Sequence, residues 1–186
     1  MVTKTGARMK KTKLIVMIGV AGCGKSFLAK YIQDTHDDCI IVSRDAIRFA
    51  LLKDGEDYFA HEDEVVSRYY DNINRALGVH KYVVADATHL TARARRQFFN
   101  NVNTKNAEVI GVWIDTPLAV ALKQNNQRSG RAKVPEDVIR RMYKQRVPPQ
   151  QSEEFDEMIF ISKDVDMATS TKSVKIESVF DKLKEI

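Results

Sequence analysis

The stretch GVAGCGKSF, residues 19–27, follows the apolar run KLIVMI and precedes LAKYIQ. It satisfies the P-loop pattern G-x-x-x-x-G-K-[ST], with a buried strand expected before it and a helix after it. Small residues let successive backbone N–H groups surround a phosphate, and the helix N-terminus adds partial positive charge. The stretch therefore predicts a site for a nucleoside triphosphate, and it raises the question of which group receives the phosphate.

The residues of this loop have separate expected roles. Lys25 is expected to reach the β- and γ-phosphates of ATP or another NTP, and the Ser26 hydroxyl is expected to bind Mg²⁺. The nucleotide is expected to contact Gly22, Cys23, Gly24, Lys25, Ser26 and Phe27. The alternative is a glycine turn that binds nothing, and the matching strand and helix on either side argue against it.

Length and composition indicate one soluble globular unit. The chain has 186 residues, 44% hydrophobic and 30% charged, and no apolar run approaches the ~20 residues of a membrane span. We divide it into a basic N-terminal tail, residues 1–12, and a P-loop kinase domain, residues 13–186. The two cysteines, Cys23 and Cys39, are too few for a disulfide framework, which favours a reducing, cytoplasmic location and no membrane partner.

Strand and helix patterns alternate along the chain. Apolar runs predict strands at 14–20, 39–43, 82–87, 108–115 and 157–162. Helical spacing predicts helices at 24–34, 45–53, 62–77, 91–102, 117–127, from 135 onward and from 175 onward. This alternation predicts an α/β fold with a parallel five-stranded sheet flanked by helices.

Basic residues gather in one segment. Residues 123–146 hold eight Lys and Arg against two acidic residues. The polar, basic loop within it predicts a lid at about residues 126–136, and the charge suggests a polyanionic ligand. A solvated helix face is the alternative, and it is favoured for Arg140, Arg141 and Lys144.

Asp45 directly follows the second predicted strand. Because parallel strands end at one edge of the sheet, its carboxylate should face the same crevice as the P-loop and could accept a proton from an attacking hydroxyl. Arg48, one helical turn on, could bind an acceptor phosphate. The position of Asp45 suits a helix N-cap equally well, so both interpretations stay open.

Two further aspartates end predicted strands. Asp86 follows YVVA and Asp115 follows VIGVWI, and either could lie near Mg²⁺. Thr-Pro follows Asp115 and opens a helix, so we interpret Asp115 as a cap and favour Asp86. Arg93, Arg95 and Arg96 could contact phosphate, but a solvated helix face is favoured for them, and surface positions are expected for His61, His80 and His89. A core position is expected for Trp113, and packing is favoured over a base-stacking platform for Val65, Tyr69, Tyr70 and Ile73.

Four motifs in order resemble the phage and bacterial polynucleotide 5′-hydroxyl kinase family. They are the P-loop, RDAIR (residues 44–48), ADATHLTARARR (85–96) and RSGRAKVPEDVIRRMYKQ (128–145), so the resemblance spans about residues 13–162. It implies that Asp45 is the general base and that Arg48 contacts the phosphate beside the acceptor nucleotide. It also implies an important role for Asp86 and a lid arginine, Arg128 or Arg131, on the donor phosphates.

The chain departs from that family in two places. His89 stands where the family often has Asn, and no D-x-D-G-T phosphatase motif is present, so the chain resembles a kinase-only member. The expected reaction transfers the γ-phosphoryl group of Mg²⁺-bound ATP to 5′-hydroxyl ends of DNA or RNA, as in nucleic-acid end repair. The alternatives are a kinase of a small hydroxyl metabolite and a non-catalytic, nucleotide-gated nucleic-acid-binding module. The role of Asp45 distinguishes the binding module from the enzyme, because a protein that only binds nucleic acid needs no general base at this position.

Overall fold

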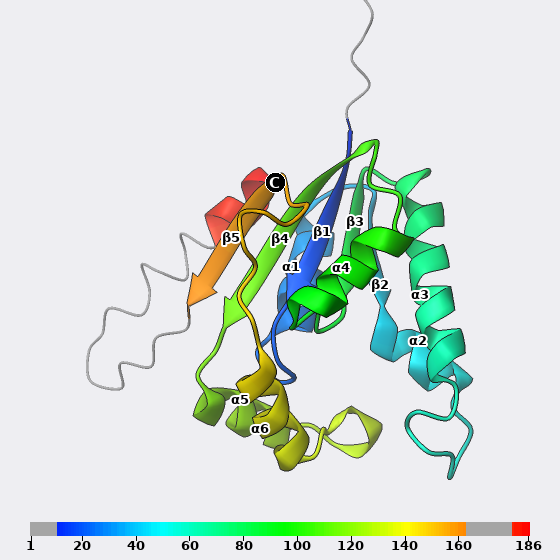
Figure 1. The fold of residues 1–186 in the computed structure, drawn as a ribbon, viewed down its shortest axis with the longest axis vertical. Coiled ribbons are helices and arrows are strands. Elements are labelled where there is room, and N and C mark those ends of the chain that lie inside the picture. The colour runs from blue at the N-terminus through cyan, green and yellow to red at the C-terminus, as the bar shows by residue number, and fades with distance from the viewer. Residues whose placement is uncertain (1–10, 163–179) are drawn as a thin grey trace, which may run out of the picture.

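Five strands form one sheet in the computed structural model, which describes residues 11–162 and 180–186 (Figure 1). The strands are β1 (Thr12–Ile18), β2 (Cys39–Ser43), β3 (Tyr82–Asp86), β4 (Ala107–Asp115) and β5 (Glu157–Ser162). Their order across the sheet is β2-β3-β1-β4-β5, and every neighbouring pair is parallel. The predicted parallel five-stranded α/β fold is therefore confirmed.

The helices connect these strands. They are α1 (Lys25–Thr35), α2 (Arg44–Leu51), α3 (Glu62–Leu77), α4 (Ala92–Asn101), α5 (Leu118–Asn126) and α6 (Glu136–Gln145), with a short 3₁₀ turn at Gly130–Ala132. The first strand begins and ends two residues earlier than predicted. Of the predicted basic tail, residues 1–10 lie outside the described residues. Residues 180–185 are helical, whereas the predicted start of that helix at 175 is outside the described part.

The sheet is covered on both faces. On one face, α1 packs Leu28 and Ile32 against Ile15 and Met17 of β1, and Leu183 joins this cluster. On the other face, the core consists of Leu14, Val16, Tyr69, Ile73, Phe98 and Trp113, from β1, α3, α4 and β4. The predicted core positions of Trp113 and of the α3 residues are confirmed. Burial on both faces is why the central strands are continuous apolar runs and do not alternate.

The carboxyl ends of the strands meet at one edge of the sheet. Figure 1 shows α2, α5 and α6 gathered at this lower end, where the strand arrows finish. In register, Asp86 of β3 pairs with Met17 of β1 and with Ser43 of β2. The residues that follow these strands, which include the P-loop and Asp45, therefore start from the same edge.

Arg95 lies in the core, so its predicted surface position is wrong. Its side chain is fully buried and donates to the Glu153 carboxylate from Nε (2.6 Å) and Nη2 (2.8 Å). Its Nη1 donates to the carbonyls of His89 and Val147, each at 3.0 Å. Arg93 and Arg96, on the same helix, are exposed as predicted.

His89 is also buried, which corrects the surface position predicted for it. Its Nδ1 donates to the Met17 carbonyl (2.8 Å), so Nε2 can accept from the Tyr69 hydroxyl (3.2 Å). Burial lowers the pKa of His89 to about 4, and the ring is neutral at ordinary pH. The side chain therefore holds the end of β1 in place and is largely shielded from solvent.

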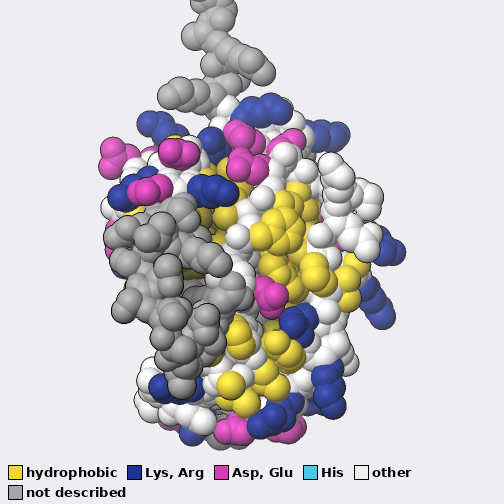
Figure 2. Space-filling model, turned by 90° about the vertical axis from the view of Figure 1, so that its left-hand side faces the viewer, with side chains coloured by type: hydrophobic (Ala, Val, Ile, Leu, Met, Phe, Trp, Pro, Cys, Tyr) yellow, Lys and Arg dark blue, Asp and Glu magenta, His cyan; other side chains and the backbone are white. Residues whose placement is uncertain are grey.

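The β5 edge of the molecule is partly apolar. Figure 2 shows hydrophobic side chains along the middle of this face, and Lys and Arg near its lower end. Phe160 of β5 is 58% exposed. Among the described residues, no helix is long and apolar enough to cross a membrane.

We predict that Arg95→Ala lowers the free energy of unfolding by about 3–5 kcal/mol, because the partly buried Glu153 carboxylate and the carbonyls of His89 and Val147 lose their common partner. Burial raises the pKa of Glu153, but the Arg95 hydrogen bond, the Gln150 N–H and the positive charges of Arg95 and Arg96 together outweigh it and hold the pKa below its ordinary value. The stabilisation is therefore present above the ordinary glutamate pKa and lost as pH falls through the lowered one, so the effect should shrink in acid. Urea unfolding at several pH values measures it. Arg96→Ala is the control, with a change within about 0.5 kcal/mol; equal effects of the two variants would contradict the prediction.

Candidate active site

The P-loop has a backbone conformation that requires glycine. Gly22 and Gly24 have φ angles of 80° and 103°, in the left-handed region. A Cβ atom on Gly22 would lie 2.3 Å from the Ala121 carbonyl oxygen. Two hydrogen bonds hold the loop from outside: the Gly19 N–H donates to the Thr88 carbonyl (3.0 Å), and Thr116 Oγ1 donates to the Cys23 carbonyl (3.2 Å).

The end of the loop is suited to bind an anion. Gly24 is the N-cap of α1, no side chain caps this helix, and its first turn has no acidic residue. Lys25 Nζ donates to the carbonyls of Gly19 (3.0 Å) and Val20 (2.9 Å), so a bound phosphate would compete with these loop carbonyls for the ammonium group. Phe27 extends outward from α1 and is 67% exposed.

Ser26 and Asp86 come together at the predicted metal position. Ser26 Oγ donates to Asp86 Oδ2 over 3.1 Å. A hydroxyl and a carboxylate oxygen beside a phosphate site are ligands that suit Mg²⁺, which is often bound by one or two carboxylates plus phosphates. Asp115 differs: it is exposed and pairs with Arg146 at 3.6 Å. It does not cap α5, whose N-cap is Pro117, so its predicted capping role is wrong.

The charges around Asp86 come from several segments of the chain. Burial raises the pKa of Asp86 above its ordinary value, and the nearby charge of Asp45 raises it further. Lys25 and Arg128 act in the opposite direction, since their positive charges favour the carboxylate. The structure thus brings together five residues that were predicted from the sequence, all of which interact electrostatically with or at Asp86: Lys25, Ser26, Asp45, Asp86 and Arg128.

Asp45 lies in the first turn of α2, beside the P-loop edge. Ser43 is the N-cap of this helix, and its Oγ accepts from the Ala46 N–H, so the capping alternative for Asp45 is wrong. Asp45 Oδ1 accepts from Arg48 Nη1 (2.9 Å) and from the Tyr58 hydroxyl (3.0 Å). Among the described residues, Oδ2 accepts no hydrogen bond, which leaves it available to a substrate hydroxyl.

Arg48 is only 4% exposed and is already paired. It forms an ion pair with Glu62, which also pairs with Arg44. The guanidinium carbon lies 4.4 Å from the centre of the Tyr58 ring. These contacts orient Arg48 toward Asp45, and an acceptor phosphate would have to share the guanidinium with Glu62.

The segment between α5 and α6 corresponds to the predicted lid. The buried Asn125 closes it, because its side chain donates to the Val134 carbonyl (2.7 Å) and accepts from the Val134 N–H (3.0 Å). Arg131 reaches across to the loop after α2, with hydrogen bonds to the Leu52 carbonyl (3.2 Å) and Asp54 (2.7 Å). Arg128, in contrast, is the lid arginine whose charge acts on Asp86.

Sequence reasoning missed three residues of this site: Glu62, Tyr58 and Arg44. Arg44 was within the quoted RDAIR motif, but its partner Glu62 is 18 residues away along the chain. Tyr58 lies in a polar loop with no regular pattern. No sequence signal pointed to these contacts, because only the folded chain brings the loop against α2.

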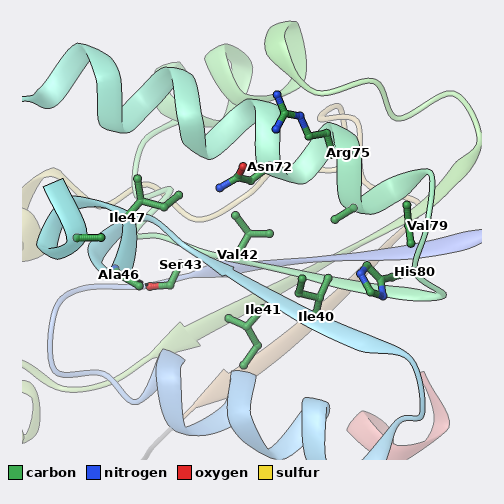
Figure 3. Close-up of a pocket in the computed structure, with 12 residues that line it drawn as sticks. Ile40, Ile41, Val42, Ser43, Ala46, Ile47, Asn72, Arg75, Val79 and His80 are labelled. Atoms are coloured by element: carbon green, nitrogen blue, oxygen red, sulfur yellow. Dashed lines mark hydrogen bonds between the residues drawn. The ribbon is translucent and has the colours of Figure 1, made fainter.

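A groove whose lining includes no P-loop residue lies between β2, α2 and α3. Figure 3 shows its lining, which includes Ile40, Val42 and Ile47 on one side and Asn72 and Arg75 of α3 on the other. Its volume is ≈ 510 Å³. It contains none of the predicted site residues.

Comparison with known proteins identifies a family. The family described as AAA domain matches residues 14–149. This range covers most of the chain, from the first strand to the end of the α6 segment. The chain therefore belongs to the AAA domain family.

Three relatives illustrate the range of similar proteins. L-seryl-tRNA(Sec) kinase of Methanococcus maripaludis is 28% identical over 136 residues, which are 70% of this chain and 51% of that protein. A chain of the Pnkp1/Rnl/Hen1 RNA repair complex has a TM-score of 0.64 and 21% identity, over 77% of this chain and 46% of that one. A gluconokinase from Sinorhizobium meliloti has a TM-score of 0.58 and 15% identity, over 95% of each chain. The chain thus has a P-loop kinase fold, and it spans about half the length of the first two relatives.

We predict that Asp86→Asn weakens the Mg²⁺-dependent part of ATP binding by about 10- to 100-fold, because the amide beside Ser26 has no negative charge with which to hold the cation. Titration calorimetry with and without Mg²⁺ measures this difference. Asp115→Asn is the matched control, because Asp115 ends β4 on the other side of β1, and this variant should bind as the wild type does. A normal Mg²⁺ dependence in Asp86→Asn would show that the metal is held elsewhere.

Proposed function

We propose that this member of the AAA domain family is a kinase that transfers the γ-phosphoryl group of ATP to the 5′-hydroxyl of DNA or RNA. The observation that carries the proposal is the arrangement of Asp45. Arg48 and Tyr58 hold its Oδ1, its Oδ2 is available, and its charge acts on Asp86 beside the P-loop. A carboxylate oriented in this way next to a phosphate site is suited to remove the proton of an attacking hydroxyl.

The donor would be bound by the P-loop. Backbone N–H groups at the start of α1 and the Lys25 ammonium group would hold the phosphates. Ser26 and Asp86 would hold Mg²⁺, which neutralises charge on the β- and γ-oxygens when it is bound. Arg128 is the favoured lid arginine over the donor phosphates, because its charge acts on Asp86.

The acceptor would lie on the side of Asp45. Its 5′-hydroxyl would donate to Asp45 Oδ2, and the oxygen would attack the γ-phosphorus as the bond to the β-phosphate oxygen breaks. Similarity to a chain of an RNA repair complex supports a polynucleotide acceptor and a role in end repair. The basic segment at 123–146 supports it too, although Arg140 and Arg141 pair with Glu136 and Asp137 as part of a solvated helix face, as predicted.

A kinase of a small hydroxyl metabolite is the second candidate. The pairing of Arg44 and Arg48 with Glu62 and Asp45 favours it, because these two carboxylates balance the two arginines, which then attract an acceptor phosphate less strongly. The gluconokinase match, which covers nearly all of both chains, points the same way. The third alternative, a nucleotide-gated binding module, gives no reason for Arg48 and Tyr58 to orient Asp45.

Incubation with labelled ATP tests the substrate class. The purified protein is given 5′-hydroxyl DNA and RNA oligonucleotides, gluconate and other small hydroxyl compounds, and serine-charged tRNA. The proposal expects label at oligonucleotide 5′ ends. Label only on a small metabolite would replace the proposal with the second candidate, and no transfer despite ATP binding would support the module.

On the same panel, Asp45→Asn should bind ATP normally and lose about 10²–10⁴ in kcat, because the amide cannot accept the proton. The variant should fold, since Ser43 caps α2 and the Asp45 side chain is 64% exposed. Asp34→Asn, at an exposed position on α1, is the matched control. Turnover of Asp45→Asn within a few-fold of wild type would exclude Asp45 as the base while leaving the kinase assignment intact.

The two lid arginines should differ in their kinetic effects. Arg128→Ala should lower kcat on the order of 10³-fold, with a smaller change in the KM for ATP, because its charge is needed most when charge spreads over the γ-oxygens. Arg131→Ala should change kcat much less, since Arg131 contacts the Leu52 and Lys53 carbonyls and Asp54. Steady-state kinetics of both variants measure this, and the reverse order of effects would assign the donor phosphates to Arg131.

A further inference from the structure

The loop between α2 and α3 places two aromatic side chains beside Asp45. The Tyr58 and Phe59 ring centres are 4.9 Å apart, with an edge-to-face angle of 84°. The Tyr58 hydroxyl donates to Asp45 Oδ1, and the Tyr58 ring lies against the Arg48 guanidinium. The Phe59 ring centre is 5.9 Å from the Arg48 guanidinium carbon, so it belongs to the same cluster.

Phe59 is held in place but is not buried. Its backbone N–H donates to Asp57 Oδ1 (2.8 Å), and its carbonyl accepts from the Glu62 N–H (3.1 Å). Its side chain is nevertheless exposed, at 63% for the residue, whereas Phe98 and Tyr69 are at most 2% exposed. A phenylalanine on a fixed backbone with most of its surface in water contributes little to the core, and it is free to stack against a ligand.

The charged residues near Phe59 offer little electrostatic attraction for a phosphate of the acceptor. Arg44 and Arg48 are balanced by Glu62 and Asp45, so this cluster of four has no net charge. Attraction for an acceptor phosphate is therefore weak at this point, and recognition has to come from another kind of contact. An aromatic face next to a guanidinium is well suited to a planar nucleobase, because every base has a π-face that can stack.

We propose that Phe59, supported by the Tyr58 ring and Arg48, is the platform on which the 5′-terminal base of the acceptor stacks. This rests on the proposed function and specifies its substrate: a nucleoside end whose base is recognised, with little dependence on which base it is. A nucleoside has its base and its 5′-hydroxyl on one sugar, so the base on Phe59 directs that hydroxyl toward Asp45. Sugars and other non-aromatic metabolites lack the group that this platform binds.

Two 5′-hydroxyl oligonucleotides that differ only at the first nucleotide test the proposal. One has a normal base there, and the other has an abasic tetrahydrofuran residue. The wild type should show a KM about tenfold lower for the oligonucleotide with the base. Phe59→Ala should remove this difference by raising the KM for the normal end, while kcat stays within a few-fold. Phe59→Trp, which keeps an aromatic face, should retain the preference.

Phe160→Ala is the matched control, because Phe160 is 58% exposed but lies on β5, at the opposite edge of the sheet from β2. It should keep the wild-type preference. Equal KM values of the wild type for the two oligonucleotides, or a full preference retained in Phe59→Ala, would overturn the platform while leaving the 5′-kinase activity in place. Phosphorylation of neither oligonucleotide would instead overturn the proposed function on which the platform rests.

Discussion

The hydrogen bond between Ser26 and Asp86 connects the two halves of the candidate site. It joins the start of α1 to the end of β3, and it is possible because β3 pairs in parallel with β1, with Met17 opposite Asp86. The same register places Ser43 of β2 opposite Asp86, so the chain that follows β2 brings Asp45 to this edge. The donor side and the acceptor side are thus set by one parallel register.

The two sides differ in their electrostatics. On the donor side, Lys25 and Arg128 provide positive charge around a buried carboxylate, an arrangement that attracts phosphates and a metal ion. On the acceptor side of the proposed reaction, Glu62 and Asp45 together balance the charges of Arg44 and Arg48 on α2. In the proposed reaction, charge favours the nucleotide donor, whereas the acceptor would be selected by hydrogen bonding to Asp45 and by the shape of the surface around it.

Buried polar contacts hold the segments next to the P-loop, which are the end of β1 and the loop after β3. His89 binds the carbonyl of Met17 near the end of β1, and Arg95 binds the carbonyl of His89 together with Glu153. The neighbouring Thr88 carbonyl accepts from the Gly19 N–H at the start of the P-loop. Because buried polar groups are costly without partners, this chain of contacts restricts the loop after β3 to one arrangement and keeps Asp86 near Ser26.

The sequence by itself determined the parts of this protein that depend on local pattern. Continuous apolar runs located all five strands, the glycine spacing located the P-loop, and the aspartates at strand ends located Asp45 and Asp86. What only the tertiary structure decided are contacts between distant segments. From the sequence, Arg95 is expected on the exposed face of a polar helix, but in the folded chain it pairs with Glu153, which is 58 residues away. In the same way, Ser43 is the N-cap of α2, Arg131 donates hydrogen bonds to the loop at 52–54, and the Tyr58 hydroxyl donates to Asp45. Each of these outcomes depends on the position of a partner in space, which periodicity along the chain does not specify.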